Sequence, residues 1–406
     1  MGNKSRYGTW GVSIVAIAWL LSGTLAAAEV VRRPHIVLLL ADDMRWDLMG
    51  CAGHPVVQTP SLDRLASQGV MFTQSFCTTS ICAVNRASLL TGQYASRHRV
   101  LNFATPVAGE AFAQTFPAAL RRAGYYSGFV GKWGLGGPLP ENEFDFWEGF
   151  GGQGRFFEKE GGEHLTARQA KQALRFLAEA PTDRPFFLYV SFKAPHAQDG
   201  AAREFPPDPR HESLYANVTV PEPPTATPEA FAALPPFIQN SENRTRWQRR
   251  FATPEMYQAT TKDHFRLITG MDEAVGRIMQ ALHDRGLAEH TVVIFTGDNG
   301  FFLGEHGLAG KWLMHEESIR VPLLIRGPAP INAPPARTLD AMVLSVDVAP
   351  TIFDLAGLPV PANLQGQSLK PLLIGERPAW RNEFFYEHHY DHGGRIPPSE
   401  GIRDTR

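Results

Sequence analysis

Two continuous apolar runs constrain the fold of this chain more than any other feature. They are HIVLLLADD at residues 35–43 and TVVIFTGDN at residues 291–299, and each ends in a pair of acidic or amide side chains. A third run, PFFLYVSFKAPH at residues 185–196, has the same character. Runs without polar alternation are typical of strands buried on both faces, as in a parallel sheet.

Helical patterns separate these strands. Segments 59–69, 115–124 and 166–180 have helical spacing, and the segment 262–286 carries one apolar stripe. The stripe consists of Phe265, Ile268, Val275, Ile278, Met279 and Leu282. Helices that alternate with apolar strands predict an α/β fold with a mostly parallel central sheet, covered by helices on both faces. In such sheets, ligands lie beyond the carboxyl ends of the strands.

The domain organisation follows from local composition. Lys4 and Arg6 precede a long apolar run that ends in small residues, which predicts a signal peptide over 1–28; an uncleaved anchor is the alternative. The length of 406 residues allows one large α/β domain or two, and residues 199–255 form a Pro-rich, loop-rich excursion. That excursion either shapes ligand entry or is a disordered surface insertion.

Charge and hydropathy indicate where the mature protein works. No later segment is apolar for long enough to span a bilayer, so no membrane association is expected after signal cleavage. The formal net charge of −2 gives no reason to expect a nucleic-acid partner. An arginine-rich patch, RTRWQRR at 244–250, is read as either a solvated or a ligand-facing surface. The expected location is the periplasm or the extracellular medium.

The acidic pairs at the strand ends predict a metal site. Asp42 with Asp43, and Asp298 with Asn299, place hard oxygen donors at the same edge of the predicted sheet. Neighbouring buried carboxylates repel unless a cation neutralises them, and Ca²⁺ or Mg²⁺ prefers such oxygen ligands. A capping or turn role for the Asp42–Asp43 pair is the alternative.

One of three cysteines needs an explanation, because an odd number leaves at least one unpaired. Cys51 and Cys77 could form a disulfide, although nothing in the sequence requires it. Cys82 lies at the expected start of a helix, with Arg86 one turn along. The helix dipole and the arginine favour a thiolate or a bound anion at residue 82, and a buried free thiol is the alternative.

Positive side chains complete the same edge. Lys132 and Lys311 both occur in the tripeptide GKW, and His196 follows the strand 185–195. A divalent cation, fixed positive charges and a nucleophile position together suit an oxyanion ester, with phosphoryl or sulfuryl transfer as the reaction. His196 is a candidate general acid, and a structural histidine is the alternative.

These motifs, taken in order, resemble a known family. LLLADDMRWD, CAVNRASLLTG, GKWGLG, SFKAPH, FTGDNG, LGEHGLAGKW and SVDVAPTIFDLAG resemble the type I sulfatases of the alkaline phosphatase-like superfamily, from about residue 34 to residue 403. The resemblance implies a sulfatase catalytic domain at 34–380, sulfuric ester hydrolysis and, by analogy, a sulfated small molecule or glycan as substrate. The alternatives are a phosphoester hydrolase of the same superfamily and a catalytically silent glycan-binding relative with unconverted Cys82.

The resemblance also implies roles for individual residues. Cys82 matches the cysteine that a formylglycine-generating maturation enzyme converts to formylglycine, whose hydrated aldehyde is the nucleophile. The implied metal ligands are Asp42, Asp43, residue 82, Asp298 and Asn299. Arg86 would fix the hydrated aldehyde, Lys132 and Lys311 would contact the sulfate oxygens, and His196 would lie near the leaving-group oxygen.

Three places differ from the family pattern. After Cys82 the family usually has x-Pro-Ser-Arg or x-Ala-Ser-Arg, and this chain has Val84 and Asn85 before Arg86. Gly134 occupies the position after the first GKW where the family usually has a histidine, and His306 is the candidate substitute near the substrate. Residues 381–406 are expected to be the start of a C-terminal region that is truncated relative to the family.

Overall fold

The computed structural model describes residues 1–4, 8, 33–331 and 336–405. The predicted signal peptide at 1–28 therefore lies almost entirely outside the described residues. The chain divides into two units, Met1–Arg32 and Arg33–Arg406, and the fold below is that of the second unit. Among the described residues, no helix has both the length and the apolar character needed to cross a membrane.

An eight-stranded sheet forms the centre of the molecule, with the strand order β10-β2-β9-β6-β1-β5-β3-β4. Its strands are β1 (His35–Asp42), β2 (Val70–Phe76), β3 (Tyr126–Lys132), β4 (Phe146–Phe150), β5 (Phe186–Pro195), β6 (Thr291–Gly297), β9 (Leu323–Arg326) and β10 (Arg337–Leu344). Only β9 runs antiparallel to its neighbours, β2 and β6. The predicted mostly parallel sheet is confirmed.

The register of the central strands brings the polar strand ends together. On β1, Leu38 is opposite Tyr189 of β5 on one side and Ile294 of β6 on the other, both in parallel pairing. β3 pairs in parallel with β5. The carboxyl ends of β6, β1, β5 and β3 therefore meet at one edge of the sheet.

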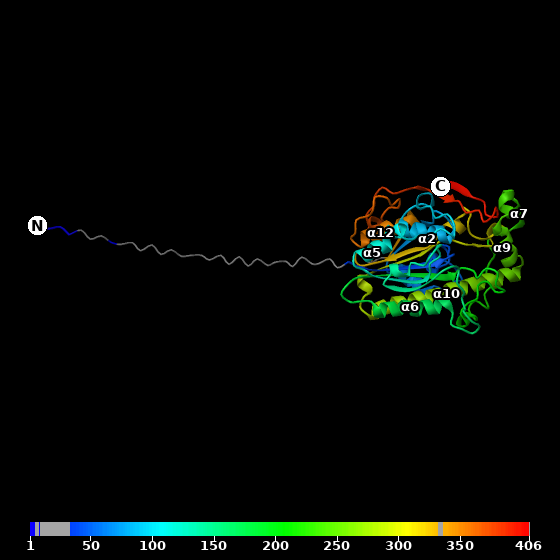
Figure 1. Ribbon diagram of the computed structural model, residues 1–406, viewed down its shortest axis with the longest axis horizontal. Coiled ribbons are helices and arrows are strands. Elements are labelled where there is room, and N and C mark those ends of the chain that lie inside the picture. The colour runs from blue at the N-terminus through cyan, green and yellow to red at the C-terminus, as the bar shows by residue number, and fades with distance from the viewer. Residues whose placement is uncertain (5–7, 9–32, 332–335, 406) are drawn as a thin grey trace. The chain divides into compact units, whose positions relative to one another are not determined.

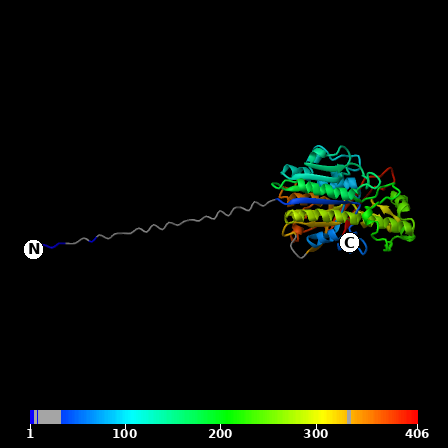
Figure 2. The ribbon, with the colours of Figure 1, turned by 90° about the horizontal axis from the view of Figure 1, so that it is seen from below.

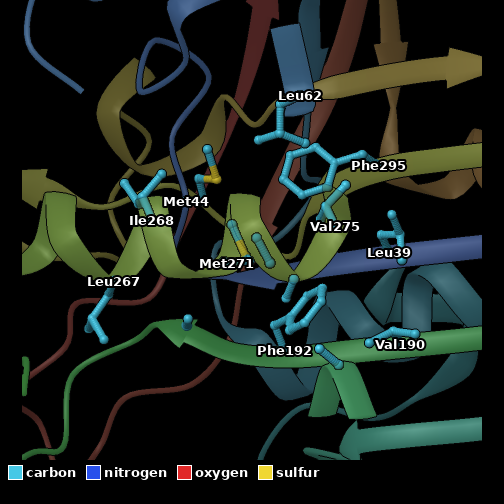
Figure 3. Close-up of a cluster of buried hydrophobic side chains, with 14 of the residues drawn as sticks. Leu39, Met44, Leu62, Val190, Phe192, Leu267, Ile268, Met271, Val275 and Phe295 are labelled. Atoms are coloured by element: carbon cyan, nitrogen blue, oxygen red, sulfur yellow. The ribbon is translucent and has the colours of Figure 1, made fainter. Parts of the chain in front are cut away.

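Helices cover both faces of the sheet, as predicted (Figures 1 and 2). On one face lie α1 (Pro60–Ser67), α6 (Leu165–Glu179) and α10 (Pro254–Asp284), and on the other lie α2 (Cys82–Thr91), α5 (Phe116–Arg122) and α12 (Val348–Leu355). The predicted stripe on α10 is buried, with Met279 partly buried at its edge. Figure 3 shows Met271 and Val275 of α10 packed over Leu39, Val190 and Phe295 of the sheet.

Short elements connect this framework. They are α3 (Ala95–His98), α4 (Glu110–Ala113), α7 (Pro228–Ala232), α8 (Pro236–Gln239), α9 (Glu242–Arg250), α11 (Glu316–Ile319), α13 (Lys370–Leu373) and six 3₁₀ turns, η1 (Gly50–Ala52), η2 (Glu141–Glu143), η3 (Pro209–His211), η4 (Ala288–His290), η5 (Glu305–Gly307) and η6 (Ser345–Asp347). Two hairpin sheets add β7 (Phe302–Leu303) with β8 (Ala309–Gly310), and β11 (Glu383–His388) with β12 (Ser399–Asp404).

The excursion at 199–255 is ordered and contains η3 and α7 to α9, so a disordered insertion is the wrong description of it. Figure 1 shows α7 and α9 together at one end of the unit Arg33–Arg406. Contacts between side chains of the excursion itself help to hold this region. The Arg244 guanidinium, for example, stacks on the rings of Phe231 and Trp247 at 4.0 and 3.9 Å. Such contacts leave no periodic signal in the sequence.

The three cysteines are all free thiols, so Cys51 and Cys77 do not form the disulfide that their presence allowed. The β11–β12 hairpin reaches the segment that precedes α2, where Thr79 Oγ1 donates a hydrogen bond to the carbonyl oxygen of Glu387 over 2.6 Å. The C-terminal residues thus support the start of the helix that carries Cys82.

Candidate active site

Cys82 is the first residue of α2 and is fully buried. Burial raises the pKa of its thiol, and nearby Asp42 and Asp298 add to that, while the charges of Lys132 and Lys311 oppose the rise without cancelling it. Of the alternatives that the sequence left open for this residue, the raised pKa favours the buried thiol over the thiolate, because desolvation outweighs the charges of the two lysines. Cys82 thus presents a buried sulfur between two lysines and two carboxylates.

Lys132 connects the end of β3 to this cysteine. Its Nζ donates to Asp42 Oδ2 over 2.5 Å and to Gln153 Oε1 over 2.6 Å, and it lies 3.9 Å from Cys82 Sγ. Lys132 and Asp42 are both completely buried. A buried ammonium in this position offers a fixed positive charge beside the sulfur of residue 82.

Arg86 lies one turn along α2 and contacts four segments at this edge of the sheet. Its Nε donates to Asp298 Oδ2 over 3.0 Å, and Nη2 lies 3.3 Å from Asp42 Oδ2. Its Nη1 donates to the carbonyl oxygen of Lys132 and to Ser191 Oγ, each over 2.6 Å. The planar guanidinium thus holds β1, β3, β5 and the residue after β6 in a fixed arrangement.

Asp43 forms the other half of the site. Its φ of 66° turns the backbone away from β1 directly after Asp42, so that the two carboxylates face different partners. Asp43 Oδ1 accepts hydrogen bonds from Lys311 Nζ and, over 2.7 Å, from Asn299 Nδ2. Asp43 Oδ2 lies 3.6 Å from His196 Nε2.

His196 is held by its main-chain neighbour. Its Nδ1 donates to the carbonyl oxygen of Ala197 over 2.6 Å, and the same oxygen accepts a hydrogen bond from Lys193 Nζ over 3.0 Å. This fixes the proton on Nδ1 and points Nε2 toward the acidic cluster. Burial lowers the pKa of His196 well below its usual range, so the ring is neutral.

The acidic cluster fits a divalent cation. Asp42, Cys82 and Asp298 place ligand atoms within 4.8 Å of one another. Asp42 Oδ1 and Asn299 Oδ1 are buried, and neither has a hydrogen-bond partner among the described residues. Burial, together with the charge of Asp42, raises the pKa of Asp298 to about 7. Unsatisfied hard oxygen atoms beside mutually repelling carboxylates are what Ca²⁺ or Mg²⁺ would relieve.

His306 and Gly134, the two positions linked to the family histidine, have different surroundings in the structure. The structure brings together all the predicted residues except His306, whose ring packs against that of His315 at 5.3 Å and whose described contacts include none with Cys82. Gly134 has a φ of 76°, and a Cβ there would lie 2.8 Å from Arg86 Cδ. A side chain at residue 134 would therefore require Arg86 to move.

Gln153 and Ser191 were missed as members of the site, and Lys193, one of the polar residues expected at the strand ends, had been given no role. Gln153 reaches Lys132 from the loop after β4, Ser191 reaches Arg86 from within β5, and Lys193 reaches Ala197 from the end of β5. A polar residue in a buried strand was the available signal for Ser191, as it was for Lys193. Gln153 lies in a glycine-rich loop that gave no signal.

Comparison with known proteins agrees with this geometry. The sulfatase family model matches residues 34–358, most of the chain. The chain belongs to the sulfatase family. This sulfatase is 30% identical to an N-acetylglucosamine-6-O-sulfatase of Bacteroides thetaiotaomicron, over 96% of this chain and 80% of that relative. It is 28% identical to an ulvan-active sulfatase of Formosa agariphila, over 87% of this chain and 68% of that protein.

Solved structures give the same result for the fold. A protein in complex with its substrate D-glucosamine-2-N,6-O-disulfate matches with a TM-score of 0.77 and 27% identity, covering 92% of this sulfatase and 87% of that chain. A phosphonate monoester hydrolase of Agrobacterium radiobacter matches with a TM-score of 0.68 and 26% identity, covering 88% and 81%. The chain is a sulfuric ester hydrolase with the alkaline phosphatase-like α/β fold.

Proposed function

We propose that this sulfatase removes a sulfate group from a saccharide, with residue 82 as the nucleophile after conversion of Cys82 to formylglycine. The observation that carries this proposal is the convergence of groups on Cys82. Lys132 Nζ lies 3.9 Å from its sulfur, and carboxylate oxygens of Asp42 and Asp298 lie within 4.8 Å. The raised pKa of the thiol argues against the unmodified cysteine as the attacking group.

Formylglycine would supply, in its hydrated form, a hydroxyl nucleophile that returns to the aldehyde after each turnover. The chain provides the environment for it. Arg86, fixed by four contacts, lies on the same helix face one turn away and would hold the hydroxyl in place. Asn85, also on α2, donates to the carbonyl oxygen of Asp298 over 2.5 Å and ties the helix to the metal-binding edge.

A bound Ca²⁺, or Mg²⁺ in its place, would polarise the sulfate oxygens and stabilise the negative charge around residue 82. Asp42, Asp43, Asp298 and Asn299 would hold it, together with residue 82. Their unsatisfied oxygen atoms and the raised pKa of Asp298 support this assignment. With the carboxylates occupied by the cation, Lys132 and Lys311 would be available to contact sulfate oxygens.

His196 would protonate the oxygen of the leaving alcohol. Its Nδ1 is committed to the carbonyl oxygen of Ala197, which leaves Nε2 as the atom that carries the proton to the substrate. The neutral imidazole would have to take up a proton as the anionic substrate binds, since the sulfate adds a negative charge next to it.

The saccharide part of the proposal rests on the relatives. An N-acetylglucosamine-6-O-sulfatase, an ulvan-active sulfatase and a protein solved with a disulfated glucosamine all resemble this chain. The basic and apolar pattern of residues 1–28 supports export, and we propose that the mature enzyme works in the periplasm or outside the cell, with residues 34–380 as its catalytic domain.

Mass spectrometry of the peptide that contains residue 82, after co-expression with a formylglycine-generating enzyme, tests the nucleophile. An aldehyde at residue 82 and loss of turnover in Cys82→Ala are expected. A thiol in folded, active enzyme would contradict the proposal. The substrate class is tested with sulfated monosaccharides, an aryl sulfate, and the matching phosphate and phosphonate esters. The similarity to a phosphonate monoester hydrolase makes preferential cleavage of the phosphonate the competing outcome.

A further inference from the structure

The arginine-rich helix α9 lies against the part of the chain that carries Lys311. Asn243, which is fully buried, donates from Nδ2 to the carbonyl oxygens of Ala309 and Lys311 over 3.1 and 2.8 Å. The Arg246 guanidinium lies 4.9 Å from the ring centre of Trp312, the residue after Lys311. These contacts place the side chain of Arg246 at the rim of the candidate active site.

Asp199 joins this helix to the other arm of the site. It lies three residues after His196, in the loop that follows β5. Arg246 Nη1 and Arg250 Nη2 both donate to the same oxygen of Asp199, Oδ1, over 2.8 and 2.7 Å. Asp199 therefore bridges the segment of His196 and the segment of Lys311.

The ion pairs hold the Asp199 carboxylate in a fixed orientation. Arg250 is buried and is itself fixed by an ion pair from Nε to Glu204 Oε2 of 2.6 Å. Arg246 is fixed by a bond from Nε to Glu242 Oε1 of 3.0 Å. Burial raises the pKa of Asp199, but Arg246, Arg250 and the nearby Lys311 outweigh it and lower the pKa overall. Asp199 is thus a preorganised, ionised acceptor.

Two atoms of this arrangement remain available to a ligand. Among the described residues, Asp199 Oδ2 and Arg246 Nη2 have no hydrogen-bond partner. The Asp199 side chain is 41% exposed and that of Arg246 is 18% exposed. An acceptor beside a donor matches a hydroxyl group, which donates one hydrogen bond and accepts another. The carboxylate charge would repel a second sulfate or a carboxylate at the same place.

We propose that Asp199, assisted by Arg246, is a specificity-determining residue that binds an unsulfated hydroxyl group of the saccharide whose sulfate ester lies at residue 82. This inference rests on the proposed saccharide sulfatase function. A site whose buried or fixed polar groups pair with a substrate hydroxyl discriminates strongly against a substrate that lacks it. An aryl sulfate has no such hydroxyl and would gain nothing from Asp199.

The test is the ratio of kcat/KM for N-acetylglucosamine 6-sulfate to kcat/KM for 4-nitrophenyl sulfate. Asp199→Asn, which removes the charge at nearly constant volume, is expected to lower this ratio by at least about tenfold, mainly through a higher KM for the sugar. Asp199→Glu retains an anion for the two arginines but displaces the acceptor, and should lower the ratio as well. The matched control is Asp208→Asn, which alters a carboxylate paired with Arg210 and should leave the ratio unchanged.

The outcomes separate this inference from the function on which it rests. If the wild-type enzyme hydrolyses both sulfates and neither Asp199 variant changes the ratio, the role of Asp199 is refuted while the sulfatase assignment stands. If the wild-type enzyme, with formylglycine at residue 82, cleaves the aryl sulfate but no sugar sulfate, both the saccharide proposal and this inference fail. Because Asp199→Glu keeps the ion pairs, its result stands even if Asp199→Asn does not fold.

Discussion

Lys132 and Asp42 form an ion pair of 2.5 Å between the ends of β3 and β1, and both side chains are completely buried. The strand β5 lies between them in the sheet, so the lysine reaches across a neighbour to the metal-binding edge. This ion pair therefore affects both the stability of the fold and the charge at the site, because the same ammonium lies 3.9 Å from Cys82 Sγ.

Replacing Lys132 with methionine should damage both properties. The Asp42 carboxylate would lose its nearest positive charge, and breaking a buried ion pair costs roughly 3–5 kcal/mol of the free energy of unfolding. Loss of a fixed positive charge beside the reacting group should lower kcat by about 10²-fold or more. Urea unfolding and turnover of an aryl sulfate measure the two effects.

Lys171→Met is the control for this change. Lys171 pairs with Glu163 at 2.6 Å, but the side chains are 64% and 39% exposed. A surface pair of this kind contributes at most about 1 kcal/mol, and it is remote from Cys82, so activity should be retained. A Lys132→Met enzyme with wild-type kcat would remove the lysine from the proposed chemistry.

A divalent cation should stabilise the folded enzyme. Asp42 Oδ1 and Asn299 Oδ1 are buried without partners, and the raised pKa of Asp298 reflects carboxylates that repel one another. Ca²⁺ at a hundredfold excess over its Kd should add about 2.7 kcal/mol to the free energy of unfolding, whereas a chelator should remove that increment. Thermal unfolding with Ca²⁺ and with EDTA measures it.

The cation effect should depend on the cluster and on no other acidic residue. Asp42→Asn is expected to abolish the Ca²⁺-dependent rise in unfolding temperature. Asp354→Asn, which alters a carboxylate paired with Lys370 at 2.9 Å, should keep it. An equal response of wild-type enzyme to Ca²⁺ and EDTA would show that these oxygen atoms do not form a cation site.

Lys193 should act through His196. Both side chains donate to the carbonyl oxygen of Ala197, and Lys193 is also packed over the ring of Phe156 at 5.0 Å. Burial lowers the pKa of Lys193 to about 8. Without the lysine, the turn that orients the imidazole is less constrained, so Lys193→Met should lower kcat by less than the ~10²–10⁴-fold expected for His196→Ala.

The leaving group distinguishes this positioning role from a general loss of stability. A sugar alcohol leaves as a strong base and needs a proton from His196, whereas 4-nitrophenolate leaves readily without one. The Lys193→Met defect should therefore be larger with the sugar sulfate than with the aryl sulfate. Equal defects on both substrates would assign Lys193 to folding alone.

The sheet and its functional edge could be predicted because both follow from local pattern. The apolar runs that end at Asp42 and Asp298 are parallel neighbours, and parallel strands bring their carboxyl ends together. Lys132 and His196 joined the prediction for the same reason, since each ends or follows a strand of that sheet.

The remaining features depend on tertiary contacts that the sequence does not reveal. The sequence left the state of Cys82 open, because helix position indicates a favourable dipole but gives no measure of burial. Gln153 and Asp199 lie in loops, and only the fold shows that they meet Lys132 and Arg246. His306 is close to Lys311 in sequence, yet its ring packs against His315 instead.

Acid should destabilise the fold through three histidines that accept hydrogen bonds from the backbone. His35 Nδ1 accepts from the Phe186 amide over 3.1 Å, His98 Nδ1 from the Val100 amide over 3.1 Å, and His164 Nδ1 from the Thr166 amide over 3.3 Å. A protonated ring cannot accept these bonds. Burial lowers the pKa of each of the three to about 4.

The direction of the pH dependence follows from these values. Between the ordinary histidine pKa of about 6.5 and the folded-state pKa of about 4, the unfolded chain binds more protons, so the free energy of unfolding falls as the pH falls. Burial raises the pKa of Asp272 to about 6, so protonation of this carboxyl increases the free energy of unfolding as the pH falls. Asp298 has the same effect when no cation is bound. The histidines outnumber them, because His264, His315 and His388 also have lowered pKa values.

Urea unfolding at a series of pH values from 7.5 to 4.5, with Ca²⁺ present, measures this dependence. The slope of unfolding free energy against pH is proportional to the difference in bound protons between the unfolded and folded states. His98→Gln should reduce that difference by at most about one proton between pH 6 and 5. His283→Gln, at a side chain that is 78% exposed, should leave the slope unchanged. If stability instead rises as the pH falls through this window, the buried histidines are charged in the folded enzyme, and their Nδ1 atoms cannot be accepting the three amide hydrogen bonds.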